Sequence, residues 1–132
     1  FLGDGFMAVF GAPLEVDHIS NRAVQASLQI LQELQQMNLD GRIPFTRVGI
    51  GLNVGTAITG IIGSSERKEY TMIGDIVNLA ARVEQATKDF NASLLITEQV
   101  WNDLALSDQR AEDLGLVQLK GQPRPVRLYR LA

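Results

Sequence analysis

The chain has 132 residues, of which 45% are hydrophobic, 20% charged and 6% aromatic, and this length suits a single domain with a core of its own. Twelve Lys and Arg against fifteen Asp and Glu give a net charge of -3, which argues against a nucleic-acid partner. The absence of cysteine excludes disulfides, thiolate zinc sites and cysteine nucleophiles, and no apolar run reaches the ~18 residues that a membrane span needs.

The first predicted element is a strand over residues 6–10. Both of its faces are apolar, and glycines bound it, so we predict a central strand covered on both sides. The preceding Gly3-Asp4-Gly5 is typical of a hairpin turn. Because the chain opens on Phe1 rather than Met, we expect the partner strand of this hairpin to lie upstream of it.

A helix is predicted next, capped by Asp17 or Ser20 and running to about Met37. Residues at a spacing of three to four positions are expected on its inward stripe: Ala23, Ser27, Ile30, Leu34 and Met37. The single histidine, His18, lies beside the predicted cap, and we expect it at the surface.

Residues 46–54 alternate in the manner of a half-buried strand. One face is apolar and consists of Val48, Ile50, Leu52 and Val54. The other face is nearly bare of side chains and consists of Arg47, Gly49, Gly51 and Asn53. Bare glycine positions allow a ligand or another backbone to come close. Gly55-Thr56 is expected to turn the chain into a second strand over residues 57–62.

A polar loop over residues 64–69 and a helix over residues 75–88 are predicted next. The loop precedes Thr71 and suits a mobile flap over a site. The helix places its apolar side chains on one stripe: Ile76, Leu79, Ala80 and Val83.

The C-terminal part of the chain predicts a short strand, a short helix and two closing strands. The first strand covers residues 94–96, and Thr97 caps the helix, which runs to about Leu104 with Trp101 inward. The closing strands cover residues 114–119 and 126–131 around a turn at 120–123. This order of elements indicates an α+β sandwich with a mostly antiparallel sheet.

A polar stripe on the helix at residues 75–88 is the strongest local signal for a site. At about 100° per residue, Asp75, Asn78 and Arg82 fall within about 60° of one another, opposite the apolar stripe. An amide one turn from a guanidinium suits the binding of a sugar and a phosphate. From spacing alone, an ordinary solvated helix face is the simpler interpretation.

Two further residues have both a functional and a structural interpretation. Asp4 lies at a tight turn where a carboxylate can bind Mg²⁺, but Asp-Gly is also a common turn pair. Lys120 ends a strand, where it either reaches a phosphate or is solvated. A single histidine leaves no Ser-His-Asp arrangement for hydrolysis, and no phosphate loop of the G-x-x-x-x-G-K type is present.

Four segments together resemble the catalytic domain of class III nucleotidyl cyclases. They are residues 1–11, 47–55, 73–82 and 119–121, in the order and with the gaps of that family, and they span nearly the whole chain. The resemblance implies a ferredoxin-like βαββαβ core that pairs head to tail, with active sites at the dimer interface. It identifies residues 1–132 as a catalytic domain without its N-terminal strand and first metal-binding segment.

The chemistry that the resemblance implies is cyclisation of a nucleoside triphosphate. The ribose 3′-OH attacks the α-phosphorus and pyrophosphate leaves, with two metal ions, Mg²⁺ or Mn²⁺, assisting. By position, Asp4 is similar to the second metal-binding aspartate and Asn78 to the amide that orients the ribose. Arg82 is similar to the transition-state arginine, and Lys120 to the lysine that binds the triphosphate.

The resemblance favours ATP as the substrate. Thr71 stands where many adenylyl cyclases carry an aspartate facing the purine, similar to a bacterial subgroup with a lysine-threonine pair. A threonine hydroxyl can accept a hydrogen bond from the adenine amino group. Because a hydroxyl also donates, a guanylate cyclase stays an alternative, and so does an inactive cyclase-like module for nucleotide sensing or dimerisation.

The resemblance also sets expectations for partners and setting. We expect a homodimer with two sites, regulatory domains upstream in the full protein, and a cytoplasmic catalytic domain. We expect the chain as it stands to lack turnover, since half of its metal site would precede Phe1.

Overall fold

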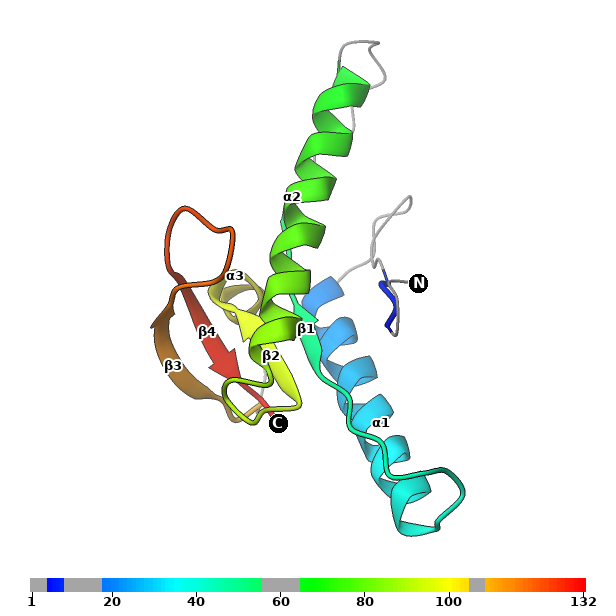
Figure 1. The fold of residues 1–132 in the computed structure, drawn as a ribbon. Helices are drawn as coiled ribbons and strands as arrows, with labels where there is room; N and C mark the ends of the chain where they lie inside the picture. Colours follow the sequence, from blue (N-terminus) through cyan, green and yellow to red (C-terminus); the bar gives the residue numbers. More distant parts are fainter. Residues whose placement is uncertain (1–4, 9–17, 56–64, 105–108) are drawn as a thin grey trace.

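The computed structural model describes residues 5–8, 18–55, 65–104 and 109–132, with residues 65–73 as backbone (Figure 1). The helices and strands follow in the order α1 (Ile19–Leu39), β1 (Ile50–Leu52), α2 (Ser65–Ala86), β2 (Leu94–Thr97), α3 (Glu98–Asp103), β3 (Glu112–Val117) and β4 (Val126–Arg130).

The strands form one mixed sheet in the order β1-β2-β4-β3. β1 and β2 run parallel, with Ile50 opposite Leu94 and Leu52 opposite Ile96, and α2 is the crossover between them. β4 runs antiparallel to both β2 and β3. Two of the three pairings are antiparallel, so the predicted α+β class with a mostly antiparallel sheet is confirmed.

Helices cover both faces of the sheet, because side chains along each strand alternate between the faces. Towards α2, Leu95 of β2 and Leu128 of β4 pack with Val83 and Ala86 in one core cluster. Towards α1 and α3, a second cluster is centred on Val24, Leu94, Ile96 and Val100. The predicted inward position of Trp101 is confirmed, since its ring stacks on Tyr129 at a centroid distance of 5.0 Å in that second cluster.

The glycine face of β1 lies against α2. A Cβ at Gly51 would lie 2.7 Å from the Ala80 carbonyl oxygen and 2.8 Å from Glu84 Cα, and one at Gly55 would lie 2.6 Å from Ile76 Cγ1. In Figure 1, α2 passes directly in front of β1. The close approach that the bare positions predicted is therefore that of another backbone, the helix α2.

The predicted strand over residues 46–54 is shorter in the structure. β1 covers Ile50–Leu52, and Val48 is exposed. Among the described residues its partner is β2, which is only four residues long, so the parallel ladder between them is short. The second strand expected over residues 57–62 lies outside the described residues.

The prediction of a covered strand over residues 6–10 is wrong for the part that the structure describes. Residues 6–8 belong to no strand, and the side chains of Phe6 and Met7 are 67% and 50% exposed. A strand persists only where a neighbouring strand pairs its N–H and C=O groups, and within the described ranges none pairs with residues 6–8. Asp4 and residues 9–10 lie outside those ranges.

The N-terminus of α1 differs from the prediction. The N-cap is His18, exposed and with φ 55°, which confirms its surface position. Ser20 does not cap the helix. It is buried inside the first turn, where its hydroxyl donates to Asp103 Oδ2 at 2.6 Å. The alternative cap, Asp17, lies outside the described residues.

The inward stripe of α1 agrees with the predicted one except at Ile30, since Ser27 is buried and Ala23, Leu34 and Met37 are partly buried. Val24 is buried and Leu28 and Leu31 pack beside it, whereas Ile30 is 45% exposed. The inward face is therefore wider than the predicted stripe, and Ser20 near its start is joined to α3 by a hydrogen bond. The C-terminal half of α1 extends past the sheet in Figure 1, and Leu39 at its end is 74% exposed.

The predicted polar loop at residues 64–69 is wrong for residues 65–69. These residues form the first turns of α2, which begins at Ser65 rather than near Asp75. The segment is rich in Glu, Arg and Lys, which are good helix formers, and it contains neither Pro nor Gly. Its polarity reflects a helix that projects beyond the sheet (Figure 1), so a flap is not formed there.

Candidate functional site

A cleft of about 560 Å³ lies between the polar face of α2 and the turn that follows β3. Its lining residues are Asp75, Asn78, Ala81, Arg82, Gln85, Gly121, Gln122 and Pro123. The helix and the turn are about forty positions apart in sequence, and the sheet brings them together. The cleft is therefore a product of the tertiary fold.

The predicted polar stripe of α2 forms one wall of the cleft. Asp75 and Asn78 are exposed and Arg82 is half-buried, while Val83 on the opposite side of the helix is fully buried. The burial of the apolar stripe against the sheet turns the polar stripe outwards. The structure thus brings Asp75, Asn78 and Arg82 together, as the spacing predicts.

Arg82 carries a charge that no described carboxylate balances. Its Nη1 donates to Gln85 Oε1 at 3.1 Å, and that partner is a neutral amide. Within the described part of the chain, each salt bridge involves another arginine. A Cβ at Gly121 would lie 3.8 Å from Arg82 Nε and Nη2, so the guanidinium faces the turn across the cleft. Such an arginine can bind an anion in the cleft.

The opposite wall is a turn with several internal contacts. Gln122 N donates to the Leu119 carbonyl at 3.1 Å, and Gln118 Nε2 donates to the Gln122 carbonyl at 2.8 Å. Gly121 has φ 78°, a conformation that favours glycine, and Leu119 is buried in the core cluster beneath α2. Lys120 is exposed between these two residues, next to the cleft but outside its lining.

The structure does not describe the side chains of the two remaining predicted site residues, Thr71 and Asp4. Thr71 lies on α2 one turn before Asp75, in the part described as backbone, and Asp4 lies outside the described residues. In the ranges that the structure covers, no group of three or more His, Asp or Glu is arranged to hold a metal ion. Asp75 is the one carboxylate in the cleft lining, so the described residues alone do not fit a divalent-cation site.

Sequence reasoning missed Gln85, which both lines the cleft and contacts Arg82. The signal was present, because residues three apart on a helix are neighbours on its surface. Gln122 and Pro123 carried no such signal, since only the folded turn brings them to α2.

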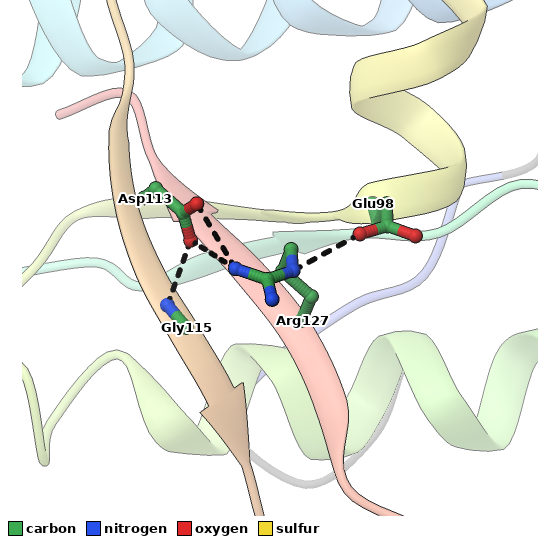
Figure 2. Close-up of polar contacts among 4 residues, drawn as sticks. All are labelled: Glu98, Asp113, Gly115 and Arg127. Carbon is green, nitrogen blue, oxygen red and sulfur yellow. Dashed lines mark hydrogen bonds and ion pairs between the residues drawn. The ribbon is translucent and has the colours of Figure 1, made fainter.

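A second polar cluster, on β3, β4 and α3, has a different electrostatic character (Figure 2). Arg127 Nη1 donates to both carboxylate oxygens of Asp113 at 3.0 Å, and its Nε lies 3.1 Å from Glu98 Oε2. The backbone N–H of Gly115, followed by Arg127, lowers the pKa of Asp113 below its ordinary value. Asp113 in turn raises the pKa of Arg127. In this cluster two carboxylates surround one guanidinium and leave an excess of negative charge, and the cluster lines no part of the cleft.

Comparison with known proteins relates the whole chain to one family. The sequence model of the adenylate and guanylate cyclase catalytic domain matches residues 1–132. Among curated relatives, the chain is 35% identical over 98% of its length to the terminal-differentiation specific adenylate cyclase of Dictyostelium discoideum. It is 32% identical over 98% of its length to an adenylate cyclase of Anabaena cylindrica.

The fold agrees with a solved structure of the same kind. The crystal structure of the adenylyl cyclase CyaB from P. aeruginosa matches with a TM-score of 0.59 and 22% identity, over 93% of this chain and 64% of that one.

The chain spans a small part of its curated relatives, 6% of the Dictyostelium protein and 26% of the Anabaena protein. Among the described helices, none combines the length and the apolar character needed to cross a bilayer. With the family match over all 132 residues and the agreement in fold, the chain belongs to the adenylate and guanylate cyclase catalytic domain family.

Proposed function

We propose that this chain is the catalytic domain of an adenylate cyclase, which converts ATP to 3′,5′-cyclic AMP and pyrophosphate. The observation that carries the proposal is the cleft in which Asn78 and an arginine without a described carboxylate partner face the turn that bears Lys120. The curated relatives named as adenylate cyclases support the choice of reaction.

In the proposed reaction, a bond forms between the ribose 3′ oxygen and the α-phosphorus. The bond from that phosphorus to the oxygen bridging to the β-phosphate breaks, the hydroxyl proton is released, and pyrophosphate leaves. Asn78 orients the ribose, Arg82 stabilises the negative charge that develops at the α-phosphate, and Lys120 binds the triphosphate. These are positioning and charge-stabilising roles, which is what phosphoryl transfer requires of a protein.

Two divalent ions, Mg²⁺ or Mn²⁺, belong to the proposal through Asp4, which corresponds by sequence to a metal-binding aspartate of the family. The described residues do not complete such a site, and we assign no step to the ions.

Thr71 supports ATP over GTP, because its hydroxyl can accept a hydrogen bond from the adenine amino group. The test supplies the complete protein with ATP or GTP together with Mg²⁺ or Mn²⁺ and separates the products. Cyclic AMP as the main product supports the proposal, and cyclic GMP as the main product reverses the argument from Thr71. Triphosphate binding without any cyclic product would favour an inactive nucleotide-sensing module.

We further propose that the site is shared between two copies of the chain, with Asp4 from one copy facing Asn78 and Arg82 of the other. Asp4→Asn and Arg82→Ala variants are then inactive separately. In a mixed dimer, one site carries both substitutions and the other carries neither, so mixing restores about a quarter of the wild-type activity when copies pair at random. Restoration in the mixture supports the shared site, and a mixture as inactive as its components contradicts it.

A further inference from the structure

We propose that Asn53 is a positioning residue that holds α2, and with it Asn78 and Arg82, in register above the sheet. The inference rests on the proposed function, since it concerns how the same site is kept in place. Asn53 follows directly after β1, and it is not among the residues that line the cleft.

The Asn53 amide joins three elements of the fold. Its Nδ2 donates to the backbone carbonyl of Ile76 on α2 at 3.1 Å, two residues before Asn78. Its Oδ1 accepts from the hydroxyl of Thr97 at 3.0 Å. Thr97 is fully buried at the end of β2, where its hydroxyl also accepts from Val100 N and caps α3. One side chain therefore connects the end of β1 to α2 and to the junction of β2 with α3.

The partners dictate which way the amide points. The Ile76 carbonyl can only accept, so it requires the NH₂ group, and a reversed amide would place two oxygens against each other. The Thr97 hydroxyl already accepts from Val100 N, which leaves its single proton for Asn53 Oδ1. Both hydrogen bonds are therefore directional, and a shift of α2 breaks at least one of them.

The rest of this face of β1 cannot set the register of α2. Gly49, Gly51 and Gly55 let the helix approach closely but present no side chain that resists sliding along the strand. Among the described hydrogen bonds, the one from Asn53 joins this face to α2. Because a displacement of about 1 Å in a catalytic group can cost about 10²-fold in rate, this contact matters for Asn78 and Arg82.

The test is Asn53→Asp in the complete protein. This nearly isosteric change keeps the acceptor for Thr97 but places a carboxylate oxygen against the Ile76 carbonyl. We expect kcat per folded molecule to fall by about 10- to 100-fold while the KM for ATP changes by less than about threefold, since the displaced groups act in the transition state.

The chain offers a matched control in Asn38→Asp. The Asn38 amide also makes two hydrogen bonds, donating to the Thr46 carbonyl at 2.8 Å and accepting from Thr46 N at 3.0 Å, at the far end of α1. The same substitution breaks the same kind of contact there without touching α2. We expect its kcat to equal that of the wild type.

Asn53→Ala is measured alongside, because it removes both hydrogen bonds without adding a charge, and the folded fraction of each variant is taken from circular dichroism. The inference is overturned if both Asn53 variants keep the wild-type kcat, if KM rises while kcat holds, or if neither variant folds.

Amide hydrogen exchange over residues 75–86 gives a readout that is independent of turnover. We expect faster exchange there in Asn53→Asp than in Asn38→Asp, and equal exchange overturns the inference. A wild-type protein that forms no cyclic nucleotide would instead contradict the proposed function, while the exchange result would still decide the role of Asn53.

Discussion

Arg82 on α2 and Arg127 on β4 lie in two regions that use the same side chain in opposite ways. Arg127 contacts two carboxylates, Asp113 and Glu98, which more than balance its charge and tie three elements together (Figure 2). The described contact of Arg82 is with a neutral glutamine, and its guanidinium borders a cleft. The contacts of Arg127 join parts of the fold. Those of Arg82 leave a positive charge that an anionic ligand can bind.

The difference shows that a site cannot be recognised from residue type alone. Both arginines are partly buried and both donate hydrogen bonds. What separates them is the charge of the partner, because an arginine already paired with carboxylates has little attraction left for a phosphate.

The largest expected effect is a difference in kcat between alanine variants of the two arginines. Arg82→Ala should lower kcat by about 10²- to 10³-fold, the usual cost of losing a preorganised transition-state donor. Arg127→Ala should leave kcat per folded molecule unchanged, because its region does not border the cleft. Steady-state production of cyclic AMP measures both, and equal losses in the two variants would remove the distinction between the regions.

The next effect concerns the packing that places Arg82. Gly51→Ala puts a methyl group against the α2 backbone and should lower the free energy of unfolding by about 1–3 kcal/mol. A Cβ at Gly74 would have no heavy atom within 4 Å. Gly74→Ala should therefore raise the free energy of unfolding by about 0.5–1 kcal/mol, because alanine favours the helix over glycine. Urea unfolding measures both changes. A stability for Gly51→Ala equal to the wild type would show that α2 does not depend on close contact with β1.

A smaller effect is expected when Arg82 is given a carboxylate partner, as Arg127 has. Gln85→Glu gives Arg82 a carboxylate partner on the same helix, so we expect kcat/KM for ATP to fall about tenfold, or roughly 1.4 kcal/mol. Gln99→Glu adds the same charge at an exposed position on α3, across the sheet from α2, and serves as the control. An unchanged kcat/KM in Gln85→Glu would mean that the charge of Arg82 is not used by the substrate.

The smallest expected effect is the pH dependence of the Arg127 region. The Gly115 N–H and then Arg127 lower the pKa of Asp113 in the folded state, so these contacts with the carboxylate stabilise the fold fully above the ordinary aspartate pKa of about 3.9. That contribution is lost as the pH falls through the folded-state value. The melting temperature of Asp113→Asn should lie slightly below the wild-type value at pH 7, with the gap closing below about pH 4. A gap that persists in acid would exclude the charge of the Asp113 carboxylate as its source.

Local patterns in the sequence predicted much of the fold and part of the cleft. The alternation around β1, the Thr97 cap, the buried β2 and the stripe of Asp75, Asn78 and Arg82 are all present in the structure. Each depends on residues that are close in sequence, so periodicity and capping were sufficient to find them.

The errors occurred where two local patterns were equally acceptable. The inward face of α1 includes Val24 and Leu28 as well as the predicted Ser27, because a spacing of three to four positions fits more than one stripe. The charged residues before Thr71 suit an exposed loop or an exposed helix, and the structure has a helix.

The sequence by itself determined most of the helices and strands from Ile19 onwards, the polar stripe of α2 and the side chains available for chemistry, because these follow from short-range geometry. The tertiary structure decided which charges are balanced and which face a cleft, because the sheet brings the turn at Gly121 to Arg82 and brings Asp113 and Glu98 to Arg127. Electrostatic pairing depends on distances across the fold, and those distances are set only when the sheet and its helices pack together.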